Sequence, residues 1–513
     1  MNEQSWSKRL LVFALPVIVL LFYLRASSHF DYTTDDAYIY LQFANNFIQG
    51  KGISFNAGEP TYGITSPLWL FVISLGGWLG VDLFLAAKAI DLVIASCAIL
   101  VFYFVAFEVI RDMIVSMLAT FAFSLHIGLL RWAGSGMETS LSVLLVLAVF
   151  LFCLRNEYLL SIVFAALLTL TRPEACILVG FLLYDIYINS HDKQRARKLI
   201  IRVTAVYAAL LAPWLIYAYV TFGTVIPNTA LAKSRFGFDL PDMIDRVLGI
   251  INILGASDAV AIVVLIGSGV FLFIYFRKNT PSKESDEEKF FLKRLSILGF
   301  GWIIALPLLY CIRHVVVVQR YLLLISPFIL VLAFSFLFRT VMKSRFAKFT
   351  YATVVLCAGL IVIQNQTVYR VVVAPGIEAH EIGINTSLIS IGKWLKENTS
   401  PEETVLAWDI GAVGFYSDRK ICDAAGLVTP GMIPYLHDGY SMKQMIDENV
   451  YEPLCDVGYI VHCSQEPEEL KTNPNLEPLF SRPFYGRGLL TNRIDYYTLY
   501  KVKNHHSQQK ESM

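Results

Sequence analysis

The sequence predicts a polytopic α-helical membrane protein of about eleven transmembrane helices, followed by a C-terminal α/β domain outside the cytoplasm. The first observation behind this fold class is the composition: 56% of the 513 residues are hydrophobic, 16% are charged, and the mean hydropathy is +0.56. Soluble proteins of this length are much more polar. The second observation is a change near residue 364, after which a soluble pattern continues for about 150 residues, a common domain size.

The charge and cysteine patterns exclude several classes of protein. The formal net charge is +1 and none of the nucleic-acid motifs is present, so no nucleic-acid partner is predicted. The eight cysteines show no metal-ligand spacing, and five lie in apolar runs, where cysteine behaves as a small buried hydrophobe. The other three, Cys422, Cys455 and Cys463, lie in the polar C-terminal part. A disulfide can form between two of them, but the sequence supports no particular pair.

Eleven apolar runs approach the roughly 20 residues that cross about 30 Å of hydrocarbon. Lys8 and Arg9 precede the first run as in a signal peptide, but no small-residue cleavage site follows it, so we expect a retained first span. The predicted spans are residues 10–26, 84–107, 113–130, 141–154, 158–170, 175–187, 199–220, 259–276, 295–312, 322–338 and 351–363.

One further apolar run, residues 67–79, is predicted to be re-entrant or interfacial rather than spanning. The reason is the positive-inside rule, which places basic loops in the cytoplasm. With a cytoplasmic N-terminus, those loops all lie inside only if this run enters the membrane and returns. Such a segment requires protein around its backbone or a cavity beside it. The basic loops are residues 191–198, 277–294 and 339–348.

This topology gathers five polar segments on the non-cytoplasmic face of a membrane domain that spans residues 1–365. They hold the most unusual polar residues of the chain, so we expect chemistry at this face, beside the re-entrant segment 67–80. The five segments are residues 27–66 (the first outer loop), 131–139, 171–174, 222–258 and 313–320.

Residues 366–503 are predicted to form the extracytoplasmic α/β domain, and residues 504–513 a disordered tail. Acids and glycines between Asp409 and Leu427 lack the spacing of a phosphate-binding loop, and we expect them to shape the face that meets the membrane domain. The local patterns predict a helix at 389–397, strands at 404–408, 459–462 and 496–502, and a turn at 411–415.

Two adjacent carboxylates, Asp35 and Asp36, are the strongest candidates for chemistry. They follow Thr34 at the start of a predicted helix that Gly50 ends, and the apolar and polar stripes of this helix indicate an interfacial amphipathic segment. Thr34 can cap the helix, and its first turn favours acids. Capping accounts for one acid. A charged pair beside a bilayer is costly, which favours a functional role.

Charged residues in the other outer segments have structural explanations as well as functional ones. Ser135 and Glu138 fit a capping box, and Pro173 and Glu174 suit the start of a helix. Arg172 needs a partner or an anion, because it lies at a membrane boundary. Snorkelling cations are expected mainly on the cytoplasmic side. A phosphate bound at the outer interface would explain the remaining cations, which are Lys233, Arg313, His314 and Arg320.

Six short motifs are distributed over nearly the whole chain. They are DDAYI at 35–39, YGITSPLW at 62–69, GMET at 136–139, TRPE at 171–174, PNTALAK at 227–233 and DIGAVGFY at 409–416. In this order they resemble the motifs of bacterial GT-C membrane glycosyltransferases related to the mycobacterial terminal arabinofuranosyltransferase AftB.

The resemblance implies a GT-C-like transmembrane bundle whose first outer loop carries a catalytic aspartate. It also implies a polyprenyl-phosphate-linked sugar as donor, inversion of the anomeric centre, and a C-terminal domain that helps to bind the acceptor glycan. The expected location is a bacterial inner membrane, with the C-terminal domain in the periplasm. Some GT-C enzymes use a divalent metal. Asp35 or Asp36 with Glu138 could hold one here, and the sequence leaves this open.

The predicted function is transfer of a sugar to a cell-envelope glycan or glycolipid at the outer face of the membrane. Asp35 is the first candidate and Asp36 the second for the general base that takes the proton of the acceptor hydroxyl. The lipid phosphate needs no acid to leave, and nearby cations stabilise its charge. The predicted substrate-binding residues are Tyr62, Glu138, Arg172, Glu174, Asn228, Lys233, Arg313, His314 and Arg320.

Two other classes of function fit parts of this pattern. A transporter or flippase of lipid-linked sugars would also have intramembrane charges and broken helices. A non-enzymatic scaffold with a sugar-binding outer domain would leave Asp35 and Asp36 dispensable. The charges gather at one face rather than at the membrane midplane, and no inverted repeat is visible. This distribution favours the enzyme.

Overall fold

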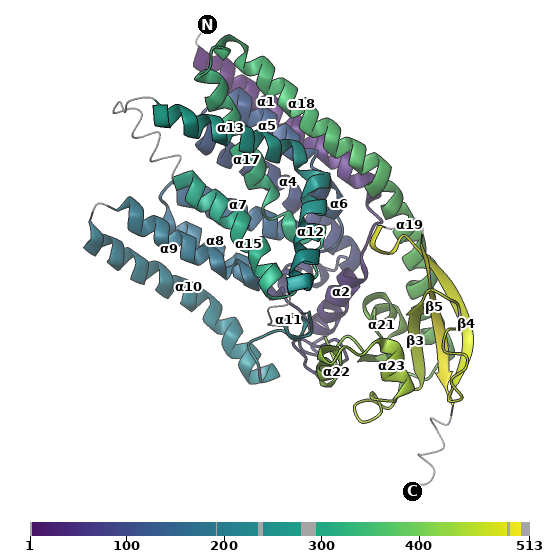
Figure 1. Ribbon diagram of the computed structural model, residues 1–513. Helices are drawn as coiled ribbons and strands as arrows, with labels where there is room; N and C mark the ends of the chain where they lie inside the picture. Colours follow the sequence, from purple (N-terminus) through teal and green to yellow (C-terminus); the bar gives the residue numbers. More distant parts are fainter. Residues whose placement is uncertain (1–2, 191, 234–239, 279–293, 490–492, 504–513) are drawn as a thin grey trace.

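The computed structural model describes residues 3–190, 192–233, 240–278, 294–489 and 493–503. Helices form a bundle, and a small domain built around a sheet lies at one end of it, which we name the domain end (Figure 1). Helix α1 (Glu3–Ala26) begins at the opposite end. The predicted disordered tail, residues 504–513, and most of the basic loop 277–294 lie outside the described residues.

Every apolar run predicted from the sequence lies on a helix. Four described helical segments are long and apolar enough to cross a membrane: Leu83–Ile110, Lys193–Phe222, Ala259–Arg277 and Ala347–Asn398. The predicted class of helical membrane protein is therefore confirmed, whereas the number of eleven spans stays a prediction. The bundle helices after α1 are α2 (Asp35–Ile48), α3 (Pro67–Trp78), α4 (Leu83–Ile110), α5 (Met113–Ser124), α6 (Ile127–Trp132), α7 (Thr139–Leu154), α8 (Tyr158–Thr169), α9 (Ile177–Asn189), α10 (Lys193–Phe222), α11 (Asn228–Lys233), α12 (Leu240–Ser257), α13 (Ala259–Lys278), α15 (Gly301–Ile312), α16 (Gln319–Leu322), α17 (Ser326–Met342) and α18 (Thr350–Val368).

The run predicted as one span at 113–130 consists of two helices, α5 and α6. The break is at His126, whose Nδ1 accepts the backbone N–H of Gly128 at 3.2 Å and so caps α6. Nε2 of the same ring lies 3.3 Å from a carboxylate oxygen of Asp258, and both side chains are buried. A histidine with partners on both ring nitrogens fixes this break, which hydrophobicity alone does not reveal.

Helix α2 begins and ends as predicted, and protein covers many of its side chains. Ala37, Tyr38, Leu41 and Phe43 are all buried, because α2 packs against α3 and against a helix of the C-terminal domain. The predicted interfacial position of α2 stays a prediction. Thr34 occupies the N-cap position, yet its hydroxyl makes no hydrogen bond to any part of the chain that the structure describes. Within the described residues, the Thr34 side chain therefore does not form the predicted helix cap.

Helix α3 corresponds to the predicted re-entrant segment. At its start, Leu68 N–H donates to Leu170 O at 3.2 Å. Near its end, a Cβ on Gly77 would lie 3.0 Å from Ile48 Cδ1 at the end of α2. Both ends of α3 thus contact the ends of other helices, α8 and α2, and the sidedness of the segment stays a prediction.

A reporter fused after Gly80 is expected to signal a non-cytoplasmic location, because a re-entrant α3 returns the chain to the face it left. A second fusion after Arg111, following α4, should signal the cytoplasm and serves as the control. A cytoplasmic signal from the Gly80 fusion would contradict the re-entrant arrangement and invert every later loop.

One continuous helical stretch, Ala347–Asn398, joins the bundle to the C-terminal domain. Two wider π-type turns link its straight parts, α18, α19 (Ala374–Ile384) and α20 (Ser390–Asn398). The predicted domain boundary at residues 365 and 366 falls within this helix. The change in composition therefore marks where the helix passes into polar surroundings, and no loop separates the two domains at this point.

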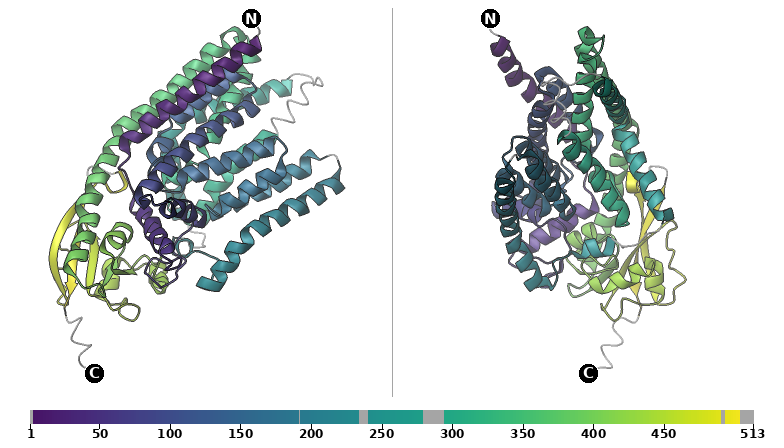
Figure 2. Two further views of the ribbon diagram at one scale, coloured as in Figure 1. Left: turned by 180° about the vertical axis from the view of Figure 1, so that it is seen from behind. Right: turned by 60° about the vertical axis from the view of Figure 1, so that its left-hand side comes forward.

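The C-terminal domain is a mixed sheet with helices beside it (Figure 2). Its five strands have the order β2-β1-β3-β5-β4. The first three strands are parallel, and the last two form an antiparallel edge. The α/β prediction is confirmed, but residues 411–415 belong to a helix instead of a turn, and β2 and β4 were not predicted. The elements are β1 (Thr404–Ala407), α21 (Gly411–Ser417), β2 (Lys420–Asp423), α22 (Ile433–His437), α23 (Met442–Asp447), β3 (Tyr459–Ser464), β4 (Leu476–Tyr485) and β5 (Ile494–Val502).

A disulfide joins Cys422 at the end of β2 to Cys455, and Cys463 is a free thiol. Replacing Cys455 with serine should lower the free energy of unfolding of this domain by about 3–4 kcal/mol, because the bridge restricts the unfolded chain. The midpoint of urea unfolding, followed by limited proteolysis of the domain, measures the loss. Cys463→Ser leaves the bridge intact and should cost less. An equal midpoint for Cys455→Ser and wild type would contradict a structural role for the bridge.

Candidate active site

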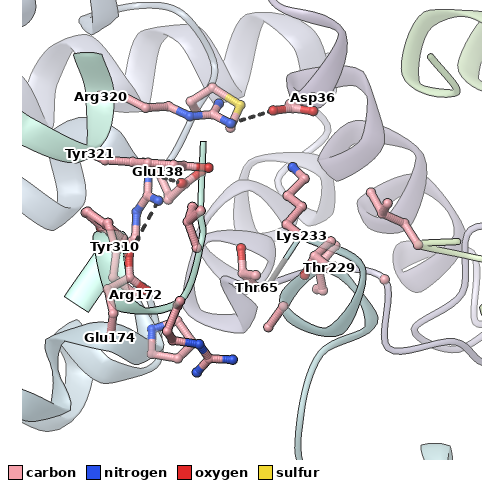
Figure 3. A pocket seen from close by; sticks show the side chains of 18 of the residues that line it. Asp36, Thr65, Glu138, Arg172, Glu174, Thr229, Lys233, Tyr310, Arg320 and Tyr321 are labelled. Carbon is pink, nitrogen blue, oxygen red and sulfur yellow. Dashed lines mark hydrogen bonds and ion pairs between the residues drawn. The ribbon is translucent and has the colours of Figure 1, made fainter. Parts of the chain in front are cut away.

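A cavity of about 300 Å³ lies at the domain end of the bundle. This volume is at the lower limit for small-molecule sites. The residues around it come from segments far apart in the sequence (Figure 3). Seven of the eleven predicted site residues line it: Asp36, Glu138, Arg172, Glu174, Lys233, Arg313 and Arg320.

Asp36 and Arg320 form an ion pair at the edge of this cavity. Arg320 Nη2 lies 2.5 Å from Asp36 Oδ2, and the guanidinium also lies over the ring of Trp132. Burial by itself would raise the pKa of Asp36, but the cations of Lys233 and Arg320 outweigh it and hold this pKa well below the usual range. Asp36 is therefore ionised at any physiological pH.

Arg172 has carboxylate partners on two sides. Its Nη2 lies 2.6 Å from Glu138 Oε1, and its Nη1 lies 3.8 Å from Glu174 Oε1. Tyr310 donates a hydrogen bond of 2.8 Å to Glu174, and the ring of Tyr321 lies under the guanidinium. The partner that an arginine at a membrane boundary requires is thus a pair of glutamates.

The predicted capping box at Ser135 and Glu138 is not formed. Glu138 stands at the N-cap position of α7 without a side-chain cap bond, and its carboxylate turns to Arg172 instead. Ser135 Oγ donates to Trp132 O at 2.7 Å. An ion pair with a buried arginine is stronger than a hydrogen bond to a helix N–H, which is why the motif is used differently.

Lys233 and Arg313 complete the cationic lining. Lys233 ends α11, and its amine points into the cavity toward Asp36 (Figure 3). Its charge acts on Asp36 and also on Asp423 of the C-terminal domain. Arg313 lines the cavity where α15 ends. The cavity therefore has cations on several sides.

Asp35 points toward the C-terminal domain and is absent from the cavity lining. Its two carboxylate oxygens accept the backbone N–H groups of Gly411 at 2.9 Å and Ala412 at 2.7 Å, at the start of α21. Burial, followed by the nearby Asp409 carboxylate, raises the pKa of Asp35 to about 7. The two neighbouring aspartates thus have different surroundings and different acidities.

Three further predicted residues also lie outside the lining. The hydroxyl of Tyr62 accepts a hydrogen bond of 2.8 Å from Trp214, which ties α10 to the first outer loop. Asn228 donates from Nδ2 to Leu427 O at 3.0 Å. His314 pairs with Asp242 of α12. These contacts support the walls of the cavity without entering it.

Sequence reasoning missed several lining residues. Tyr321 and Thr229 stand beside or inside motifs that were singled out, so proximity to those motifs was a usable signal. Leu427 lies about a hundred residues beyond the nearest other lining residue, and only tertiary contacts bring it there. The missed polar and apolar lining residues include Tyr40, Thr65, Thr229, Tyr310, Tyr321 and Leu427.

A divalent metal has little support from the residues present. Asp36 and Glu138, two of the acids considered as ligands, are each bound to an arginine. Within the described ranges, no group of three His, Cys, Asp or Glu side chains gathers closely enough to hold a metal ion. The cations around the cavity are the groups available to meet an anionic ligand.

Solved structures share this architecture. ArnT from Cupriavidus metallidurans bound to undecaprenyl phosphate is similar over 97% of this chain and 98% of its own, with a TM-score of 0.57 and 13% identity. An Archaeoglobus fulgidus oligosaccharyltransferase is similar over 90% of this chain and 70% of its own, with a TM-score of 0.59 and 14% identity. The mycobacterial arabinofuranosyltransferase AftD matches 95% of this chain but 41% of its own, with a TM-score of 0.51 and 17% identity.

Sequence comparison adds less. Residues 376–500 match the model of a domain of unknown function, DUF8728. No curated protein sequence is significantly similar to the chain. The structural similarities show that the chain shares the fold of these proteins, as predicted, and membership of the GT-C superfamily stays a prediction. The narrower resemblance to AftB stays a prediction.

Proposed function

We propose that this protein is a membrane glycosyltransferase that moves a sugar from a polyprenyl-phosphate donor to a cell-envelope glycan or glycolipid. The observation that carries the proposal is the charge pattern of the cavity. Four cations, Lys233, Arg172, Arg313 and Arg320, face three carboxylates, Asp36, Glu138 and Glu174. One positive charge remains, which matches the single negative charge of a phosphodiester such as a sugar linked to a lipid phosphate.

Asp36 is the proposed general base. It removes the proton from the acceptor hydroxyl while that oxygen attacks the anomeric carbon, and the bond from this carbon to the phosphate oxygen breaks. Attack from the face opposite the phosphate inverts the anomeric centre. The support for Asp36 is its place in the cavity lining and its ionised state.

The proposed order of the two aspartates is the reverse of the one favoured by sequence. The two carboxylate oxygens of Asp35 accept hydrogen bonds from the backbone N–H groups of Gly411 and Ala412. These bonds direct the carboxylate to α21, and Asp35 does not line the cavity. Its proposed role is to dock the C-terminal domain beside Asp36, so it acts as a positioning residue.

Lys233, Arg313 and Arg320 are the proposed ligands of the donor phosphate. Their charges stabilise the phosphate as it leaves, which is where negative charge develops. Arg320 also pairs with Asp36. A phosphate that draws Arg320 toward itself weakens this pair and makes Asp36 a stronger base when the donor is bound.

The proposed location is a bacterial inner membrane, with the domain end in the periplasm. This fits the Cys422–Cys455 disulfide, because such bonds persist in oxidising compartments. It also fits a lipid-linked donor, which is used at the membrane surface. The GT-C structures named above are similar proteins, and one of them is bound to undecaprenyl phosphate.

The proposal is tested with purified protein in lipid nanodiscs, radiolabelled undecaprenyl-phosphate sugars and a cell-envelope glycan acceptor. Label is expected in the glycan, with the anomeric configuration inverted relative to the donor. The same protein in sealed vesicles should not move the lipid-linked sugar between leaflets. Translocation without glycan labelling would support a flippase instead and overturn the proposal.

A further inference from the structure

The C-terminal domain reaches the cavity through one short loop, residues 423–429, which we name the Asp423 loop. Among the lining residues that the structure describes, Leu427 is the one contributed by this domain. This residue is 7% exposed. Leu427 therefore adds an apolar side chain from a second domain to a lining whose charged groups all come from the membrane domain.

Asp423 holds the loop from inside its own domain. This carboxylate is fully buried and accepts the N–H groups of Ala425 at 2.8 Å, Leu427 at 2.5 Å and Val428 at 2.9 Å. Burial raises the pKa of Asp423 to about 6, against the opposing effect of these N–H groups. Because three N–H groups converge on one side chain, the loop has a defined shape before any ligand binds.

The membrane domain holds the same loop from the other side. Asn228 Nδ2 donates to Leu427 O at 3.0 Å, next to Thr229 in the cavity wall. A Cβ on Gly63 would lie 3.0 Å from both Leu427 O and Val428 Cγ1, so the two domains meet closely here. Leu427 is thus fixed on the Lys233 side of the cavity.

We infer that Leu427 is the specificity-determining wall against which the transferred sugar packs, and that Asp423 is its positioning residue. This inference rests on the proposed function. The cations recognise the phosphate and do not distinguish one linked sugar from another. An apolar wall discriminates, since one added or missing carbon group in an apolar site changes kcat/KM by about 10–200-fold. A sugar hydroxyl facing Leu427 would be buried without a partner, so the favoured sugar presents C–H groups there.

The test compares undecaprenyl-phosphate pentose with undecaprenyl-phosphate hexose, whose sugars differ by one hydroxymethyl group. Leu427→Ala should raise the hexose-to-pentose ratio of kcat/KM by about tenfold or more, because it opens space at the wall. Asp423→Asn should shift this ratio in the same direction, mainly through the donor KM. Leu454→Ala, a leucine of the same domain that is 44% exposed, should leave the ratio unchanged. An unchanged ratio for Leu427→Ala would overturn the inference.

A labelling experiment separates this inference from the proposed function. Leu427→Cys is made with Cys176→Ser, since Cys176 also lines the cavity, and a small membrane-impermeant thiol reagent is added. Undecaprenyl-phosphate pentose should slow labelling severalfold, and undecaprenyl phosphate without sugar should slow it much less. Equal labelling rates with undecaprenyl-phosphate pentose and with undecaprenyl phosphate would contradict contact between Leu427 and the sugar, even if the enzyme is active. If wild type transfers neither sugar, the proposed function fails while this measurement still decides the role of Leu427.

Discussion

Asp36→Asn is expected to lower kcat about a thousandfold, because general-base catalysis contributes roughly 10²–10⁴-fold. The amide keeps the size of the side chain but cannot accept the proton of the acceptor hydroxyl. Donor KM should change much less than kcat. Initial rates of sugar transfer at several donor concentrations give the two constants separately.

The matched control for this variant is its neighbour, Asp35→Asn. An asparagine there still accepts one of the two N–H groups from α21, so kcat should fall about tenfold, which corresponds to about 1.5 kcal/mol, the low end for one hydrogen bond to a charged acceptor. Asp36→Asn also leaves Arg320 without its anion, so folding is verified by size exclusion and protease resistance. Asp36→Glu, which retains the charge, should recover part of the activity. A large loss in Asp35→Asn with little loss in Asp36→Asn would assign the base to Asp35.

Gly411→Ala is expected to have the second largest effect, through the junction of the two domains. A Cβ at this position would lie 1.9 Å from Asp35 O, so α21 must move away from the start of α2. Because Asp36 is the next residue of α2, activity should fall about a hundredfold, as misplacement by an ångström typically does. Transfer assays and the protease sensitivity of the chain near residue 400 measure the two consequences.

Gly359→Ala is the control for this substitution. Gly359 lies within α18, and apart from its chain neighbours and the backbone of its own helix, no described atom lies within 4 Å of the position its Cβ would occupy. Its activity should equal that of the wild type. Wild-type activity in Gly411→Ala would show that the contact between Asp35 and α21 is not needed for catalysis.

Much of the candidate site could be read from the sequence, because ionisable residues at the ends of apolar helices are few and expensive. The segments holding Glu138, Arg172 and Arg320 were grouped on one face by charge alone, and all three line one cavity. What could not be read was how they pair. Arg320 meets Asp36 across 284 positions of the chain, and no local pattern encodes such a contact.

Local motifs were misleading where a stronger partner was available in space. Glu138 matches a capping box but binds Arg172, and Thr34 stands at a cap position without capping. In α2, Tyr38 of the polar stripe packs against Phe415 of the C-terminal domain, whereas Gln42 donates a hydrogen bond to Phe55 O of the first outer loop. A helical pattern reports which sides of a helix differ, and it does not report what covers them.

The sequence by itself determined the membrane-helical class, the C-terminal α/β domain and the charged segments that meet at one face. These follow from hydrophobicity and charge, which are properties of short stretches. The tertiary structure alone decided which aspartate faces the cavity and that Leu427 forms part of its wall. Consecutive residues on a helix point about 100° apart, so Asp35 and Asp36 had to meet different neighbours. Which neighbour each one meets depends on how the C-terminal domain docks against α2, and docking is settled by packing between distant parts of the chain.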